Sequence, residues 1–104
     1  MGYYTRHELE IVEGDNGIIS ELRDFAEEAN YALEENGDAG ESCKWYDHEI
    51  DMRNFSALHP DALFKLNGEG EEAGDIWIEY YQNGKMQRCK AKITYDEFDC
   101  EKLV

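Results

Sequence analysis

The sequence has few basic residues and no long apolar run. Ten lysines and arginines stand against 25 aspartates and glutamates, which gives a formal net charge of −15. A field of this sign repels nucleic-acid phosphates and anionic membranes and attracts basic protein surfaces. No stretch approaches the ~20 apolar residues of a membrane span, and the N-terminus lacks the pattern of a secretory signal. We therefore expect a cytoplasmic protein that binds neither nucleic acid nor membrane directly.

The sequence also lacks the spacing patterns of metal sites and active sites. Its three cysteines are odd in number and contain no C-x-x-C pair, which indicates reduced thiols and not a disulfide framework. Its three histidines are scattered without H-E-x-x-H spacing, and no serine lies in a nucleophile elbow. No nucleophile, base and orienting group can be assembled from neighbouring residues. We predict no catalytic residue, no metal and no cofactor, and hence no enzyme.

Enough apolar residues are present for one hydrophobic core. Apolar residues make up 41% of the chain and aromatic residues 12%. A chain of 104 residues can fold without a metal or disulfide, because independent folding becomes difficult only below roughly 40 residues. We predict a single α+β domain over residues 1–104.

Periodic apolar residues predict the elements of the first half of that domain. Residues 3–12 alternate as a strand with one buried face does, and Gly14 to Gly17 end it. A helix follows and ends at Asn36-Gly37; its inward stripe consists of Ile18, Leu22, Phe25, Ala29 and Leu33. Residues 43–46 form a short strand, and residues 48–59 form a second helix that Asp47 caps and Pro60 ends.

The second half predicts three more strands, over residues 62–68, 75–81 and 85–95. Asn83-Gly84 is typical of a type I′ turn and joins the last two strands as a hairpin. The order of elements predicts an α+β fold in which two helices pack on a four- to five-stranded antiparallel sheet.

The first helix is strongly acidic on its outer surface. It carries one base, Arg23, which cannot neutralise six carboxylates by i to i+4 pairing. Such a surface either keeps the protein soluble or binds a basic partner. On the second interpretation the partner-binding residues are Glu21, Asp24, Glu27, Glu28, Glu34 and Glu35.

The stretch LNGEGEEAGDIWIEYYQNGK, residues 66–85, combines an acidic, glycine-rich loop with an aromatic strand. Phosphate binding is disfavoured, because a phosphate loop needs helix amides behind it and no glutamates in front. The loop is either a solvated connection or a further part of the partner site. In the second case Trp77 and Tyr81 supply aromatic anchors, and the loop carboxylates are Glu69, Glu71, Glu72 and Asp75. The alternative for the aromatic rings is packing in the core and sheet.

The last predicted strand carries a basic stripe formed by Arg88, Lys90 and Lys92. If this strand lies beside the first strand, the stripe pairs with Glu8 and Glu10 across the sheet. Otherwise it forms a small basic patch for one phosphate or for an acidic partner segment.

The run CKWYDHEIDMRNFSALHPDALFKLNGEGEEAGDIWIEYYQNGK resembles a pattern in small acidic, uncharacterised proteins of phages and mobile elements. The shared features are Lys-Trp before a short helix, Ser-x-x-x-Pro, an apolar strand, Gly-Glu-Gly-Glu-Glu, Asp-x-Trp, and Tyr before Asn-Gly-Lys. The run is also similar to ferredoxin-like domains of the plasmid YubB type, and the match covers roughly residues 43–98. This resemblance implies a ferredoxin-like fold and a role as an inhibitor of host enzymes or defence systems, as in anti-CRISPR proteins that mimic DNA.

We therefore expect an acidic protein-binding module that inhibits a host nucleic-acid-handling or defence protein by binding its basic surface. Carboxylates can occupy a groove that normally holds DNA, because the duplex carries one charge per ~1.7 Å of its axis. The alternative is a non-catalytic structural or regulatory module that self-associates, as a homodimer for example, or joins a larger complex through its sheet.

Overall fold

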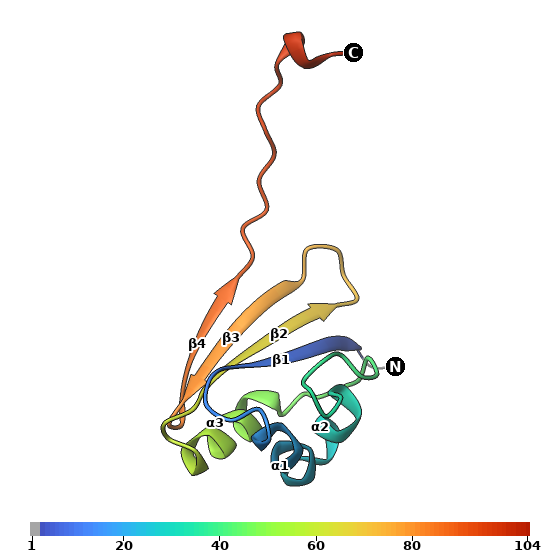
Figure 1. Cartoon of the computed structure of the whole chain (residues 1–104). Helices are drawn as coiled ribbons and strands as arrows, with labels where there is room; N and C mark the ends of the chain where they lie inside the picture. The colour runs from blue at the N-terminus through green and yellow to red at the C-terminus, as the bar shows by residue number, and fades with distance from the viewer. Residues whose placement is uncertain (1–2) are drawn as a thin grey trace.

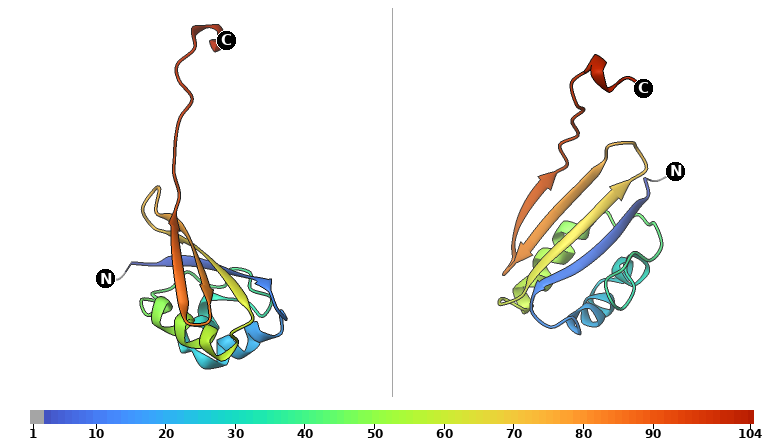
Figure 2. Two further views of the ribbon diagram at one scale, coloured as in Figure 1. Left: turned by 90° about the vertical axis from the view of Figure 1, so that its left-hand side faces the viewer. Right: turned by 45° about the horizontal axis from the view of Figure 1, so that its top comes forward.

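The computed structural model describes residues 3–104 and contains a four-stranded antiparallel sheet with three α-helices. The strands β1 (Thr5–Glu13), β2 (Leu63–Gly70), β3 (Ile76–Gln82) and β4 (Lys85–Lys90) lie side by side in chain order (Figure 1). The helices α1 (Ile18–Phe25), α2 (Glu27–Ala32) and α3 (His48–Leu58) all come between β1 and β2 and cover one face of the sheet (Figure 2). The predicted α+β class and antiparallel sheet are confirmed.

Two details of the predicted fold differ from this architecture. Three helices are present where two were predicted. The β-α-β-β-α-β order of a ferredoxin-like domain is not confirmed, because all three helices precede β2 and the last three strands follow one another without a helix between them.

The hydrophobic core lies between the sheet and the helices. Alternate residues of β1, β2 and β3 face the helices, as the period of two in a strand requires. Fully burying one large apolar side chain stabilises the fold by about 1.5–3 kcal/mol, so these residues dominate stability. The largest buried apolar side chains are Ile19, Leu22, Leu33, Met52, Phe55, Phe64, Leu66 and Tyr81.

The predicted helix over residues 18–35 is divided into α1 and α2. Ala26 is extended (φ −122°, ψ 121°), and Leu33 is extended in the same way after α2. The break changes the inward stripe, because Ala26 and Ala32 are buried whereas Phe25 is 45% exposed. Propensity alone could not locate this break, because alanine is a good helix former and only packing against the sheet places it there.

Two predicted strands are shorter than expected. Residues 43–46 contribute one bridge, Thr5 to Cys43, after which Trp45 turns into the core. β4 ends at Lys90, which pairs with Trp77, one residue after the start of β3 at Ile76. The last backbone bond of this hairpin runs from Ala91 N to Ile76 O, at 3.1 Å.

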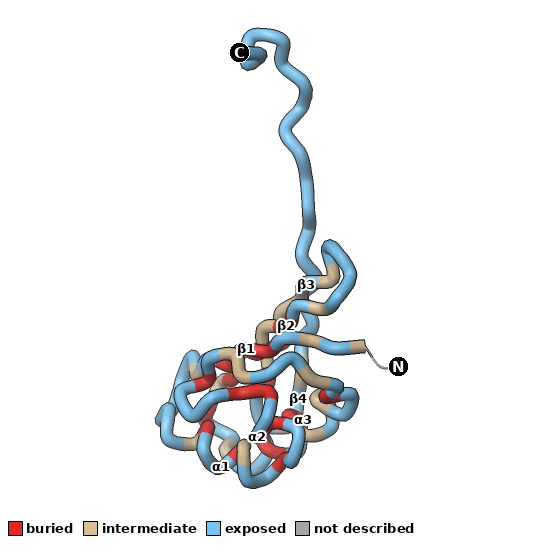
Figure 3. Tube along the Cα trace, turned by 90° about the vertical axis from the view of Figure 1, so that its right-hand side faces the viewer, coloured by how far each residue is buried: buried red, intermediate tan, exposed pale blue. Residues whose placement is uncertain are grey.

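The chain after β4 forms an exposed C-terminal tail, residues 91–104. Every residue of the tail is exposed, and it projects away from the sheet (Figures 1 and 3). Its one regular element is a 3-10 turn over Cys100–Lys102. The predicted strand 85–95 is therefore wrong beyond Lys90, and Lys92 lies in the tail.

Candidate functional site

The six carboxylates predicted on the first helix form one acidic surface over α1, α2 and the loop that follows α2. All six are exposed, and we call Glu21, Asp24, Glu27, Glu28, Glu34 and Glu35 the acidic surface. Phe25 and Tyr31 lie among them and are 45% and 54% exposed. Exposed aromatic rings beside charged groups are typical of protein interfaces, where aromatic side chains supply much of the binding energy.

Few cations neutralise the acidic surface. Within residues 3–104, Arg23 Nη1 lies 3.6 Å from Glu35 Oε1, and His59 Nε2 lies 3.4 Å from Glu21 Oε2. No Lys, Arg or His in this range lies within ion-pair distance of the other four carboxylates, Asp24, Glu27, Glu28 and Glu34. The folded chain thus leaves most of this charge available to solvent or to a partner.

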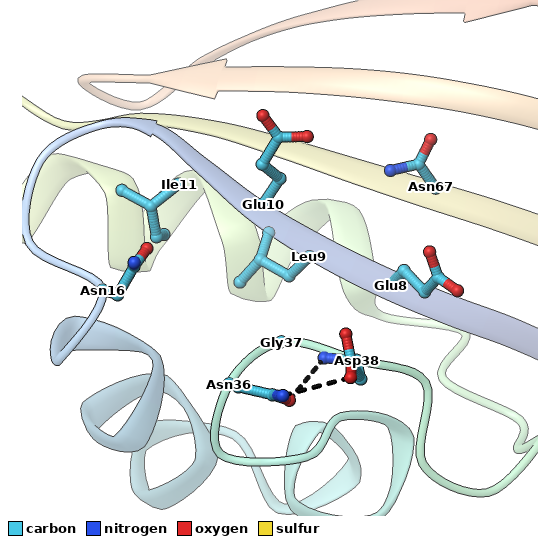
Figure 4. A pocket seen from close by; sticks show the side chains of 9 residues that line it. All are labelled: Glu8, Leu9, Glu10, Ile11, Asn16, Asn36, Gly37, Asp38 and Asn67. Atoms are coloured by element: carbon cyan, nitrogen blue, oxygen red, sulfur yellow. Dashed lines mark hydrogen bonds between the residues drawn. The ribbon is translucent and has the colours of Figure 1, made fainter.

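A shallow hollow of about 360 Å³ adjoins this surface, between β1 and the loop after α2 (Figure 4). Glu8 and Glu10 line it from β1, and Asp38 lines it from the loop. Asn36 holds the loop by donating to Asp38 Oδ2 and accepting from Asp38 N, both at 3.0 Å. The lining therefore adds carboxylates to the acidic side of the molecule, and residues 3–104 contain no cluster of His, Cys, Asp and Glu that could hold a metal ion.

The glycine-rich loop predicted as a partner site is tied to the start of the chain. Tyr3 Oη donates to Asp75 Oδ2 at 2.6 Å and accepts from Glu72 N at 3.0 Å, while Tyr4 N donates to Glu71 Oε2 at 2.9 Å. The hydrogen bond to Asp75 raises the pKa of Tyr3. Two of the four loop carboxylates are thus engaged inside the fold, whereas Glu69 and Glu72 remain exposed without such a bond from their side chains.

The two predicted aromatic anchors lie in different places. Tyr81 is fully buried and so presents no surface to a partner. Trp77 is half-buried and covers Gly68, where an added Cβ would overlap the indole ring. Of the three glycines in the stretch 66–75, Gly68 and Gly70 belong to β2 and only Gly74 lies in the loop. Gly74 is also the only one of the three with a positive φ, +85°.

A buried carboxylate, Glu79 on β3, is the centre of a polar network under the sheet. Its side chain is fully buried. Tyr81 Oη donates to Oε1 at 2.6 Å, Arg88 Nε donates to Oε2 at 2.6 Å, and His48 Nε2 lies 3.0 Å from Oε1. Burial alone would raise the pKa of Glu79, but these three groups favour the carboxylate and lower the pKa to about 2. Glu79 is therefore ionised and paired, as a buried charge must be.

The pKa values of His7 and of His48, which belongs to this network, are shifted in opposite directions. Burial, together with the nearby His48, lowers the pKa of His7 to about 4, so His7 is neutral near pH 7. Burial also acts to lower the pKa of His48, but the Glu79 carboxylate outweighs burial and raises it. His7 Nδ1 is buried and has no hydrogen-bond partner within residues 3–104. A buried polar atom without a partner needs an explanation from its surroundings.

The surroundings of His7 are a cavity of about 280 Å³ at the end of the sheet from which the tail leaves. His48 stacks on Trp77 with ring centroids 5.0 Å apart, and His7 meets Trp45 edge-on at 5.3 Å. We call this space the aromatic cavity; Trp45, Trp77, His7, His48, Arg88 and Lys90 are among the residues that line it. The volume is just below the roughly 300–1,000 Å³ of ligand pockets, which suits a single side chain better than a cofactor.

Sequence reasoning missed the aromatic cavity, although part of its signal was present. Alternation along β3 places Trp77, Glu79 and Tyr81 on one face, so a glutamate flanked by two aromatic residues on a core-facing side needs a cation. The Asn83-Gly84 turn is confirmed by its positive φ angles, 50° and 80°, and it fixes the register that sets Glu79 opposite Arg88. Neither signal reveals Trp45 and His48, which arrive from the segment before β2.

The basic stripe is also placed by this register. Arg88 and Lys90 lie on the helix side of β4, where Arg88 pairs with Glu79. The predicted pairing with Glu8 and Glu10 does not occur, because β1 and β4 are opposite edges of the sheet. The interpretation that remains is a small basic patch next to an aromatic cavity.

Comparisons with known proteins add no family to this description. No protein-family model matches the chain, and neither the curated proteins nor the solved structures that were compared with it gave a match. The resemblance to small acidic phage and mobile-element proteins therefore stays a prediction. No helix within residues 3–104 has the length and apolar character needed to cross a membrane.

Proposed function

We propose that the protein is an acidic protein-binding module that binds the basic surface of a nucleic-acid-handling protein through its acidic surface. The observation that carries the proposal is the set of four exposed carboxylates, Asp24, Glu27, Glu28 and Glu34, that have no ion-pair partner among residues 3–104. Unneutralised like charges are unfavourable on a helix surface, and a basic partner would relieve their repulsion.

The neighbouring aromatic rings support a protein partner. Phe25 and Tyr31 are about half exposed within the acidic surface, and Tyr31 lies four residues after Glu27 on the same face of α2. Such rings bury apolar area at an interface, and the carboxylates around them select a basic partner and accelerate association. Direct binding of nucleic acid is excluded from the proposal by the net charge of −15.

The class of partner follows from the chemistry of the surface. A groove that holds nucleic-acid phosphates presents lysines and arginines, which the carboxylates of α1 and α2 would contact in place of phosphates. The module would then act as a non-catalytic, cytoplasmic inhibitor of a host or defence protein, in the manner of a DNA mimic. The proposal needs no cofactor.

Affinity capture tests this proposal. The tagged protein is incubated with nuclease-treated lysate at low salt, and the retained proteins are identified by mass spectrometry before and after a high-salt wash. We expect retention of a nucleic-acid-handling protein at low salt and its release at high salt, because the screening length between exposed charges falls from about 10 Å at 0.1 M salt to about 3 Å at 1 M. Capture that persists in high salt would contradict an interface built on the acidic surface.

A further inference from the structure

The C-terminal tail carries an aromatic residue surrounded by carboxylates and begins beside the aromatic cavity. Phe98 is 79% exposed and Tyr95 is 91% exposed. Asp96, Glu97 and Asp99 lie next to Phe98 in the sequence. Both rings are therefore available to pack against another surface, where each would bury apolar area.

The aromatic cavity has the complementary chemistry. The half-buried Trp77 supplies an apolar wall, whereas Trp45 lines the cavity but is only 2% exposed. Arg88, whose guanidinium carbon lies 6.0 Å from the centre of the Trp77 ring, and Lys90 place positive charge beside this wall. Arg88 is engaged by Glu79, so Lys90, which is exposed, is the cation available to a carboxylate. The buried, unpartnered Nδ1 of His7 also belongs to a residue that lines this space. The chemistry of the two parts is complementary: a phenyl ring can pack against the indole ring of Trp77, and a carboxylate next to it in the sequence can pair with Lys90.

We propose that residues 95–99 fold back over the aromatic cavity of the same chain, with Phe98 against the half-buried Trp77 and one of its neighbouring carboxylates at Lys90. Seven residues, 91–97, separate Lys90 from Phe98. This length allows a four-residue turn with a short arm on each side, and aspartate, as at position 96, is favoured in turns. In this proposal the extended tail of Figure 1 is the open state.

Closure within one chain is favoured over exchange of tails between two copies. The tail is attached at the rim of the cavity, and a short flexible tether gives an effective concentration on the order of millimolar. Two copies that each carry a net charge of −15 also repel each other. The inference is independent of the proposed function, because the acidic surface lies on α1, α2 and the loop after α2, whereas the aromatic cavity is lined from β1, β3, β4 and the start of α3.

The indole N–H signals of the two tryptophans test closure in the full chain. In a proton–nitrogen spectrum we expect Phe98→Ala to shift the signals of both Trp45 and Trp77. The matched control Leu103→Ala removes another exposed apolar residue of the tail and should leave both signals in place. Unchanged signals in Phe98→Ala would overturn the proposal. Shifts that depend on protein concentration would overturn it too, because they indicate exchange of tails between copies.

A synthetic peptide of residues 92–104 provides a second readout. If the peptide binds the open cavity with a Kd of about 0.1 mM and the tethered tail acts at about 1 mM, Phe98→Ala should bind the peptide about tenfold more tightly than the wild type. Adding Lys90→Glu to Phe98→Ala should weaken peptide binding, whereas adding Lys85→Glu, the same charge change on the same strand, should not. Equal affinity of the wild type and Phe98→Ala, or equal effects of the two lysine changes, would contradict closure.

Discussion

Glu79 and the carboxylates of the acidic surface are the same chemical group in opposite settings. Glu79 is fully buried and meets Tyr81, Arg88 and His48, so its charge is satisfied inside the fold. Glu27 and Glu28 are exposed and have no cation within ion-pair distance among the residues described. The comparison shows that a carboxylate in this protein either stabilises the fold or contributes charge to the surface. Its burial and the presence of a cationic or hydrogen-bonding partner distinguish the two cases.

Replacing the buried carboxylate should have the largest effect. Glu79→Ala leaves Arg88 and His48 without their anion, and breaking a buried ion pair destabilises a protein by about 3–5 kcal/mol. Because the Arg88 side chain is 44% exposed, we expect the lower end, about 3 kcal/mol, measured by urea unfolding. Glu28→Ala is the control and should change the free energy of unfolding by less than about 0.5 kcal/mol. Equal effects of the two changes would contradict the contrast between these carboxylates.

Filling the space under Trp77 should have the next largest effect. In Gly68→Ala the new methyl group overlaps the indole ring, which must move from its place over β2. Overpacking of this kind costs about 1–3 kcal/mol, and Trp77 is one wall of the aromatic cavity. We expect a lower urea midpoint together with altered tryptophan fluorescence. A variant with unchanged stability and fluorescence would show that Trp77 does not lie against Gly68.

The neutral histidine should give stability a dependence on pH. The pKa of His7 is about 4 in the fold and about 6.5 in the unfolded chain, so between these values the unfolded state binds a proton that the folded state does not. Stability should therefore fall as pH is lowered from 6.5 to 4.5. Each pKa unit is worth 1.36 kcal/mol, so His7→Phe should reduce this loss by about 2 kcal/mol. Urea unfolding of the wild type and of His7→Phe at pH 6.5 and pH 4.5 measures this difference. If both proteins lost the same free energy of unfolding between the two pH values, a buried, neutral His7 would be contradicted.

Glu79 and His48 act in other pH ranges. The lowered pKa of Glu79 means that its stabilising contribution is complete above its ordinary pKa and is lost as pH falls toward about 2. The raised pKa of His48 means that its contribution is complete below about 6.5 and is lost as pH rises through the folded value. Neither range overlaps the one assigned to His7.

Neutralising the acidic surface should have the smallest effect on stability. The fourfold variant Asp24→Asn, Glu27→Gln, Glu28→Gln and Glu34→Gln removes charges that have no ion-pair partner among residues 3–104. Each such surface substitution changes stability by about 0.5 kcal/mol or less in either direction, and removing repulsion between like charges offsets part of any loss. Urea unfolding should therefore give nearly the wild-type midpoint. A large loss of stability would assign these carboxylates a structural role.

The sequence predicted the elements that depend on local pattern. The strands β1, β2 and β3 follow from alternation, and the hairpin follows from Asn83-Gly84. The break at Ala26 and the early end of β4 were not predicted, because both depend on which residues lie opposite across the core or the sheet. Local pattern is a weak guide where tertiary packing decides the outcome.

The candidate site was also predicted only in part. The exposure of the six carboxylates was predicted from the helical pattern, although Glu34 and Glu35 lie after the end of α2 and not on a helix. The aromatic cavity was not predicted, because Trp45 and His48 meet Trp77 only after the chain folds between β1 and β2. Tyr81 was considered as a surface anchor, but it is fully buried. The alternation of side chains along a strand does not by itself say which face of the strand the helices cover.

The most direct test of the account is the Kd of the captured partner for two variants with the same net charge. One is the fourfold neutral variant of the acidic surface, and the other removes four charges from the tail by Asp96→Asn, Glu97→Gln, Asp99→Asn and Glu101→Gln. We expect the first variant to bind at least about tenfold more weakly than the wild type, a loss of about 1.4 kcal/mol, and the second to bind as the wild type does. Equal weakening in both variants would mean that net charge alone attracts the partner, and it would contradict the acidic surface as the binding site.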